Sequence, residues 1–160
     1  MTRVAYNSFN GRFSDNPRAI FEELAARGLD VEHLWTSRES NPDRFPGGVL
    51  TSTPGSESHR DEVAMADFVI ANVEMREELS KRDGVVFLQT WHGTPLKKIG
   101  YDNNWVKANP AGFERDVREY ERWDYLISPN PLSTRVFREE GAFRGFDGEI
   151  IETGYPRNDA

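Results

Sequence analysis

A dense polar cluster lies near the middle of the sequence, Gln89-Thr90-Trp91-His92-Gly93-Thr94-Pro95-Leu96-Lys97-Lys98. The His92 imidazole can accept a proton from a hydroxyl group near neutral pH, which is the task of a general base. Gly93 lets a ligand approach the backbone, Thr94 can cap a helix or donate a hydrogen bond, and Lys97 or Lys98 can neutralise phosphate charge. The alternative is structural, with His92 packed at a turn and the lysines solvated. Spacing alone leaves both interpretations open.

Three predicted strands are each followed by a small polar residue and a proline: Asn16-Pro17, Thr94-Pro95 and Asn130-Pro131. Each pair is typical of a helix N-cap with proline in the first helical position. Taken singly, each pair is explained by capping. Their recurrence at the carboxyl edge of a parallel sheet, where helix N-termini favour anions, predicts a phosphate-binding crevice that includes Asn16 and Asn130.

The closing stretch, residues 150–159, repeats this pattern with a strand, a glycine turn and a proline before Arg157. The Arg157 guanidinium could hold a phosphate through several N–H groups, or it could be a solvated charge in a linker. We expect structural or surface roles for the other two histidines, His33 in a strand and His59 in a loop.

The elements that must position these residues alternate between short β-prone runs and amphipathic helices. We predict strands at Val4–Ser8, Val31–Trp35, Phe68–Asn72, Val85–Gln89, Tyr125–Ser128 and Glu149–Glu152. We predict helices around Ile20–Ala25, before a capping Gly28, and at Glu74–Lys81, Phe113–Arg122 and Leu132–Glu140. Thr36–Ser58 and Gly100–Gly112 are predicted to be irregular. This alternation indicates an α/β fold, a Rossmann-like doubly wound parallel sheet.

Length and composition favour a single domain, since 160 residues with 37% hydrophobic content suit one compact core. A net charge of -7 disfavours nucleic-acid binding. The absence of cysteine excludes thiolate metal sites, and three scattered histidines form no obvious metal cage. No signal peptide or membrane-spanning run is recognisable, so secretion is disfavoured and any membrane contact should be peripheral. Trp105, Phe113 and Trp123 could line an apolar face near the predicted crevice or belong to the core.

The chain resembles the CDP-glycerol glycerophosphotransferase family of teichoic-acid polymerases and primases. Three blocks carry the resemblance: residues 6–17, Tyr6-Asn7-Ser8-Phe9-Asn10-Gly11 through Ser14-Asp15-Asn16-Pro17; residues 88–100, which contain Trp91-His92-Gly93-Thr94-Pro95; and residues 123–131 with the closing Gly154-Tyr155-Pro156-Arg157. They occur in the expected order along nearly the whole chain.

The resemblance implies one half of a GT-B architecture, the acceptor-side half, with the donor-binding half absent from these 160 residues. It implies transfer of glycerol phosphate from CDP-glycerol to the hydroxyl end of a lipid-linked polymer, with release of CMP, at the cytoplasmic face of the membrane. His92 would be the base, with Gly93, Thr94 and Lys97 positioning acceptor or phosphate, and no cofactor or obligatory metal is implied. Because catalysis of phosphoryl transfer needs charges on both sides of the phosphate, little turnover is expected from this chain alone.

Two alternatives remain at this stage. The transferred group could be ribitol phosphate or another polyol phosphate, since the absent half would recognise the donor. The domain could instead bind the acceptor without catalysis, although binding alone gives no reason for a base at His92. A flavodoxin-like or receiver domain also fits the alternation of elements, but it explains neither the His-Gly-Thr-Pro turn nor the closing block.

Overall fold

A seven-stranded parallel sheet forms the centre of the molecule. The computed structural model describes residues 1–38, 45–75, 81–138 and 141–159. Within them the strand order is β3-β2-β1-β4-β5-β6-β7. The strands are β1 (Thr2–Asn7), β2 (Val31–Thr36), β3 (Leu50–Ser52), β4 (Phe68–Ala71), β5 (Val86–Gln89), β6 (Tyr125–Ser128) and β7 (Glu149–Glu152). The predicted Rossmann-like α/β fold is confirmed.

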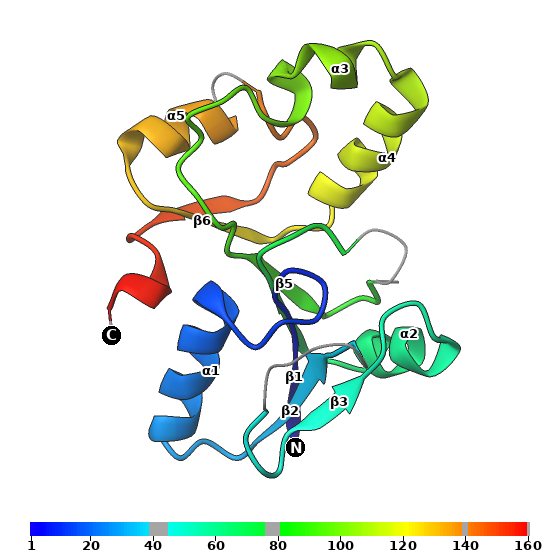
Figure 1. Cartoon of the computed structure of the whole chain (residues 1–160), viewed down its shortest axis with the longest axis vertical. Helices are drawn as coiled ribbons and strands as arrows, with labels where there is room; N and C mark the ends of the chain where they lie inside the picture. The colour runs from blue at the N-terminus through cyan, green and yellow to red at the C-terminus, as the bar shows by residue number, and fades with distance from the viewer. Residues whose placement is uncertain (39–44, 76–80, 139–140, 160) are drawn as a thin grey trace.

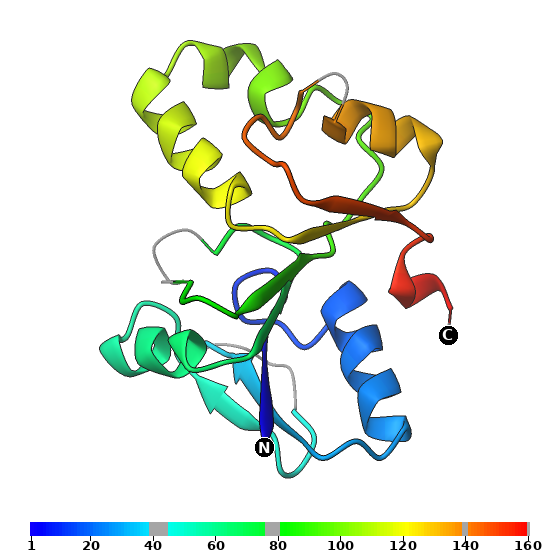
Figure 2. The same cartoon turned by 180° about the vertical axis from the view of Figure 1, so that it is seen from behind.

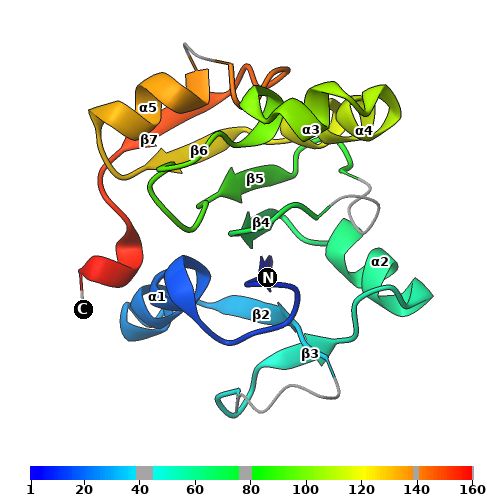
Figure 3. The same ribbon diagram turned by 45° about the horizontal axis from the view of Figure 1, so that its top comes forward.

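Helices cover both faces of this sheet. They are α1 (Asp15–Ala26), α2 (Glu57–Ala64), α3 (Asn104–Lys107), α4 (Pro110–Tyr120) and α5 (Pro131–Arg138), with 3-10 turns η2 (Gly100–Asp102) and η3 (Pro156–Asn158). Figures 1 and 2 show α3, α4 and α5 on one side of β6 and β7, with α1 on the other. Figure 3 shows α1 and α2 on opposite sides of the β1–β2 part of the sheet.

The core has one apolar cluster on each side of the sheet. The larger cluster includes Val63 of α2, Tyr120 of α4 and Phe137 of α5 against alternate residues of the central strands. The smaller one packs Phe21 of α1 against Tyr6, Trp35 and neighbouring rings. Of the aromatics that the sequence left open, Trp123 is a core residue, whereas Trp105 is 71% exposed.

Six of the seven strands in the described residues were predicted, and the predictions that failed concern short or irregular segments. The predicted loop Thr36–Ser58 contains the edge strand β3 and the start of α2, and Gly100–Gly112 contains η2, α3 and the first turn of α4. In the predicted helix Glu74–Lys81, residues 76–80 lie outside the described residues, and Glu74, Met75 and Lys81 are not helical. The helices predicted at Phe113–Arg122 and Leu132–Glu140 are found as α4 and α5, although residues 139–140 are outside the description.

Two of the three predicted Pro-containing caps are wrong. No helix follows Thr94-Pro95, because residues 90–99 form an irregular loop. Helix α1 begins at Asp15, with Ser14 in the N-cap position, so Asn16 and Pro17 lie inside its first turn. Asn130-Pro131 is confirmed, since the Asn130 side chain accepts a hydrogen bond from the Ser133 backbone N–H at 2.9 Å. No described helix is both long and apolar enough to cross a bilayer.

Candidate active site

Three buried polar residues stand side by side where the central strands end. The parallel register pairs Asn7 of β1 with Ala71 of β4, and Ala71 with Gln89 of β5. The next residue along each strand is Ser8, Asn72 or Thr90, and all three are fully buried. Adjacent strand order thus brings three loops, distant in sequence, to one point at the carboxyl edge of the sheet.

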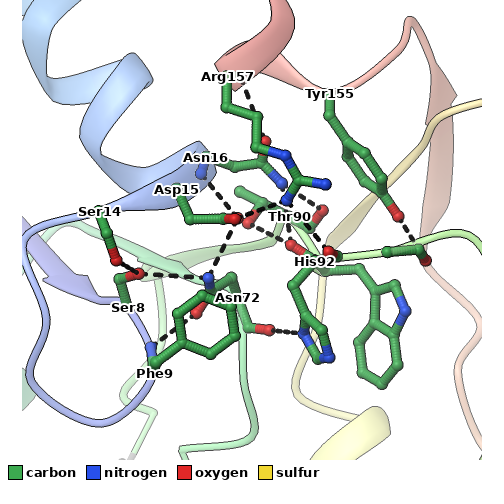
Figure 4. Close-up of polar contacts among 12 residues, drawn as sticks. Ser8, Phe9, Ser14, Asp15, Asn16, Asn72, Thr90, His92, Tyr155 and Arg157 are labelled. Atoms are coloured by element: carbon green, nitrogen blue, oxygen red, sulfur yellow. Dashed lines mark hydrogen bonds and ion pairs between the residues drawn. The ribbon is translucent and has the colours of Figure 1, made fainter.

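His92 lies in the loop after β5, and its ring is oriented by the loop after β4. Its Nδ1 is 2.5 Å from the backbone carbonyl oxygen of Asn72 (Figure 4). A carbonyl oxygen can only accept a hydrogen bond, so in the neutral ring Nδ1 carries the proton and donates it. This tautomer leaves the lone pair on Nε2. The geometry therefore gives His92 the protonation pattern that a general base requires.

Two aromatic rings flank the half-buried imidazole. The Trp91 ring stacks on it with centroids 4.4 Å apart and an interplanar angle of 28°. The Phe9 ring meets it edge-on at 5.5 Å and 62°. Trp91 is itself anchored in the core by an edge contact of 4.8 Å with Phe143. Packing on both sides therefore restricts rotation of the His92 ring.

Backbone strain is concentrated around this ring. Among the described residues, the non-glycine residues with positive φ are Phe9 (45°), Asn10 (56°), Asp15 (60°) and Trp91 (53°). All four belong to the loop after β1, the start of α1 or the loop that carries His92. Such conformations cost on the order of 1–3 kcal/mol each and persist where the surroundings hold them, as they do at functional sites.

The guanidinium of Arg157 ties the chain's closing segment to the His92 loop. Its Nη1 donates to Asp15 Oδ2 at 2.6 Å and to the backbone carbonyl of His92 at 3.1 Å. Asn16 adds to this junction, because its amide donates to the carbonyl oxygens of Thr90 and Trp91 at 3.4 and 3.0 Å. In the structure, Arg157 and Asn16 therefore hold the loop through contacts with the protein itself.

Tyr155 fixes the residue after the histidine. Its hydroxyl donates to the Gly93 carbonyl oxygen at 2.8 Å, and the Arg157 guanidinium lies 4.8 Å from the centre of its ring. Burial raises the pKa of Tyr155 to about 12, so the hydroxyl keeps its proton at neutral pH. The backbone carbonyls of His92 and Gly93 are thereby both held by the closing segment of the chain.

The residues predicted from the sequence occupy different parts of this edge. His92, Gly93, Asn16 and Arg157 form one connected group. Asn130 follows the next strand, β6, and its side-chain oxygen is engaged by Ser133. Thr94 and Lys97 are exposed on the loop beyond His92, where Lys97 lines a hollow with Lys98 and Asp102.

Sequence reasoning missed Asn72, Asp15 and Tyr155. Asn72 and Asp15 did stand next to predicted features, at the end of a strand and before Asn16, but neither carries a local signal that identifies its partner. No group of three or more potential metal ligands occurs in the part of the chain that the structure describes.

Comparison with known proteins gives one consistent family. A family model described as CDP-glycerol:poly(glycerophosphate) glycerophosphotransferase matches residues 1–160. The teichoic acid glycerol-phosphate transferase of Staphylococcus aureus is 38% identical over 98% of this chain and 41% of its own length. The teichoic acid poly(glycerol phosphate) polymerase of Staphylococcus epidermidis is 33% identical over 98% of this chain and 22% of its own length.

Solved structures agree with these sequence matches. The wall teichoic acid polymerase TagF superimposes with a TM-score of 0.88 at 33% identity, covering 99% of this chain and 39% of that chain. A TagF variant soaked with CDPG matches with the same TM-score at 32% identity. The chain thus spans less than half the length of each of these relatives.

Proposed function

The chain belongs to the CDP-glycerol:poly(glycerophosphate) glycerophosphotransferase family, and on this premise we propose that it is the acceptor-side domain of such a transferase. The reaction is transfer of glycerol phosphate from CDP-glycerol to the hydroxyl end of a teichoic-acid-type polymer, with release of CMP. The relatives named as teichoic acid polymerases and the TagF structure obtained after soaking with CDPG support this donor and acceptor.

The observation that carries the proposal is the contact of His92 Nδ1 with the Asn72 carbonyl oxygen, which requires the proton of the neutral ring to be on Nδ1. Nε2 takes the proton from the terminal hydroxyl of the acceptor as that oxygen forms a bond to the β-phosphorus of the donor. The bond between the β-phosphorus and the bridging oxygen breaks, and CMP leaves with the electron pair. Gly93, Thr94 and Lys97 are proposed to position the acceptor or its phosphate. Asn16, Asn130 and Arg157 are proposed to form part of the same substrate-binding edge of the sheet.

We place the domain in a GT-B transferase of two Rossmann-like halves, of which these 160 residues form one. The share of the relatives that the chain covers, 22% to 41%, supports this division. The second half would bind most of the donor and supply charge on the far side of the transferring phosphate. We further propose that the acceptor is lipid-linked and that the protein works peripherally at the cytoplasmic face of the membrane.

Transfer assays test the proposal directly. This chain alone is compared with a chimaera in which it replaces the matching part of the Staphylococcus aureus transferase, each with CDP-glycerol and a lipid-linked primer analogue. We expect activity only from the chimaera and a loss of about 10²–10⁴-fold with His92→Ala. Retention of full activity by the His92→Ala chimaera would place the base elsewhere.

A further inference from the structure

Asn72 touches His92 only through its backbone, yet its side chain is the centre of a buried hydrogen-bond network. The residue is fully buried. Its Oδ1 accepts a hydrogen bond from the Phe9 backbone N–H at 2.9 Å, and its Nδ2 donates to Ser8 Oγ and Asp15 Oδ1, both at 3.2 Å. These partners fix which end of the amide is oxygen, because a backbone N–H needs an acceptor and a carboxylate needs a donor.

The contacts close a circuit around His92, as Figure 4 shows. Asn72 holds the imidazole through its carbonyl oxygen and holds Asp15 through its amide. Asp15 pairs with Arg157, which donates in turn to the backbone carbonyl of His92. The ring and the backbone of His92 are therefore fixed by three connected residues, Asn72, Asp15 and Arg157. Of these, Asn72 also restrains Phe9 through its side chain.

The geometry points to Asn72 as a positioning residue that selects the Nδ1-protonated tautomer of His92 and thereby leaves Nε2 as the base. Imidazole in water has no such restraint, so a carbonyl held against Nδ1 must set the tautomer. The carbonyl can do this only while the turn at Asn72 is rigid. Three side-chain hydrogen bonds in a dry environment supply that rigidity.

Two substitutions at Asn72 distinguish the role of the side-chain donor from that of the side-chain acceptor. Asn72→Ala removes every side-chain contact and leaves the Phe9 N–H without its acceptor. Asn72→Asp keeps the size and the acceptor, but it removes the donor and places a second carboxylate against Asp15. Asn109→Ala is the matched control, because Asn109 caps α4 through the Gly112 N–H and is exposed, away from His92.

The first test is the 15N spectrum of the histidine side chains in this chain, with the His92 signals assigned by their loss in His92→Gln. We expect Nδ1 of wild-type His92 to be the protonated nitrogen above neutral pH. Both Asn72 variants should shift His92 to a mixture of tautomers, whereas Asn109→Ala should leave its signals unchanged. A wild-type His92 protonated on Nε2 overturns the inference whether or not the variants fold. Folded Asn72 variants that retain the wild-type tautomer overturn it as well.

The catalytic consequence rests on the proposed function and is tested separately in the chimaera. There, Asn72→Ala should lower kcat on the order of 10- to 100-fold, less than loss of the base itself, with the KM for CDP-glycerol unchanged. If His92→Ala leaves activity intact, the proposed function fails while the spectrum still decides the role of Asn72. If His92→Ala is inactive but Asn72→Ala has wild-type kcat, the positioning role is wrong.

Discussion

A histidine outside the site, His33 of β2, is expected to make stability depend on pH. Its Nδ1 lies 2.9 Å from the Tyr6 hydroxyl, and its ring meets Phe21 at 4.7 Å. Burial lowers the pKa of His33, so as pH falls the unfolded chain takes up its proton before the folded chain does. The contribution of His33 to the free energy of unfolding is therefore fully present above the pKa of histidine in the unfolded chain, about 6.5, and declines as pH falls below it.

Replacing His33 tests whether this residue lowers the stability of the protein as pH falls. Urea unfolding from about pH 7 to about pH 5 should show wild type losing more stability than His33→Gln over the same interval, because glutamine does not titrate. Burial also raises the pKa of Tyr6, which stays neutral and does not contribute to the slope. Equal slopes for the two proteins would contradict a lowered His33 pKa.

The hydroxyl of Tyr155 should stabilise the His92 loop without contributing pH dependence. Tyr155→Phe leaves the buried ring in place and removes the hydrogen bond to the Gly93 carbonyl, at a cost of about 1 kcal/mol. Since the pKa of Tyr155 is raised to about 12, this cost should be the same across neutral pH. Tyr101→Phe is the control, because within the described residues the Tyr101 hydroxyl makes no hydrogen bond; its urea midpoint should not change.

At the residue scale, the sequence singled out His92 and Gly93 as candidates because their neighbours in sequence carry the signal. It failed for Asn72 because the relevant contact joins the ends of β4 and β5, and only strand order makes these two ends neighbours. Arg157 was identified as a cation, but its pairing with Asp15 depends on where η3 lies against α1. Local patterns specify chemical groups, whereas their partners follow from topology.

At the scale of elements, the Pro-containing caps show what a local motif can and cannot specify. Asn130-Pro131 begins α5, a helix of 8 residues. Thr94-Pro95 begins no helix: residues 90–99 form an irregular loop, and Gly100, soon after this pair, has a positive φ of 50°. Strand β3 was missed because three residues at a sheet edge give almost no periodicity.

Gly100 joins the start of η2 to the segment after α5 by a close backbone approach. A Cβ at Gly100 would collide with the carbonyl oxygen of Ala142, which also accepts a hydrogen bond from the Tyr101 N–H at 2.9 Å. Gly141 has a similar positive φ of 75° but open space around its Cα. The two glycines therefore separate conformational strain from steric overlap.

Alanine substitutions at the two glycines should differ accordingly. Gly141→Ala should cost about 1–2 kcal/mol from the positive φ alone. Gly100→Ala should cost about 3 kcal/mol or more, since overpacking against backbone is added to the same strain. The measurement is the free energy of urea unfolding for both variants. Equal costs would mean that the backbone at Ala142 shifts to accommodate the added Cβ with little loss of stability.

At the scale of the whole molecule, the alternation of strands and helices was sufficient to predict the parallel sheet, but not how its faces are covered. Helix α1 covers the β1–β2 part of one face. Beside it, a groove of about 600 Å³ runs along β4 to β7, lined almost entirely by apolar side chains such as Val86, Leu88 and Ile151. Periodicity shows that both faces of these strands are apolar; it does not show what packs on them.

This groove should bind a hydrophobic fluorescent dye, because it is a concave hollow lined almost entirely by apolar side chains. Phe68 lines the groove and is 42% exposed, so Phe68→Thr should weaken dye binding severalfold with a stability change within about 1 kcal/mol. Leu50→Thr is the matched control, since Leu50 is a similarly exposed strand residue outside the groove, and its dye binding should equal that of wild type. If the two variants bind dye alike, the dye site lies elsewhere, and this face of the sheet is less accessible in solution than the fold indicates.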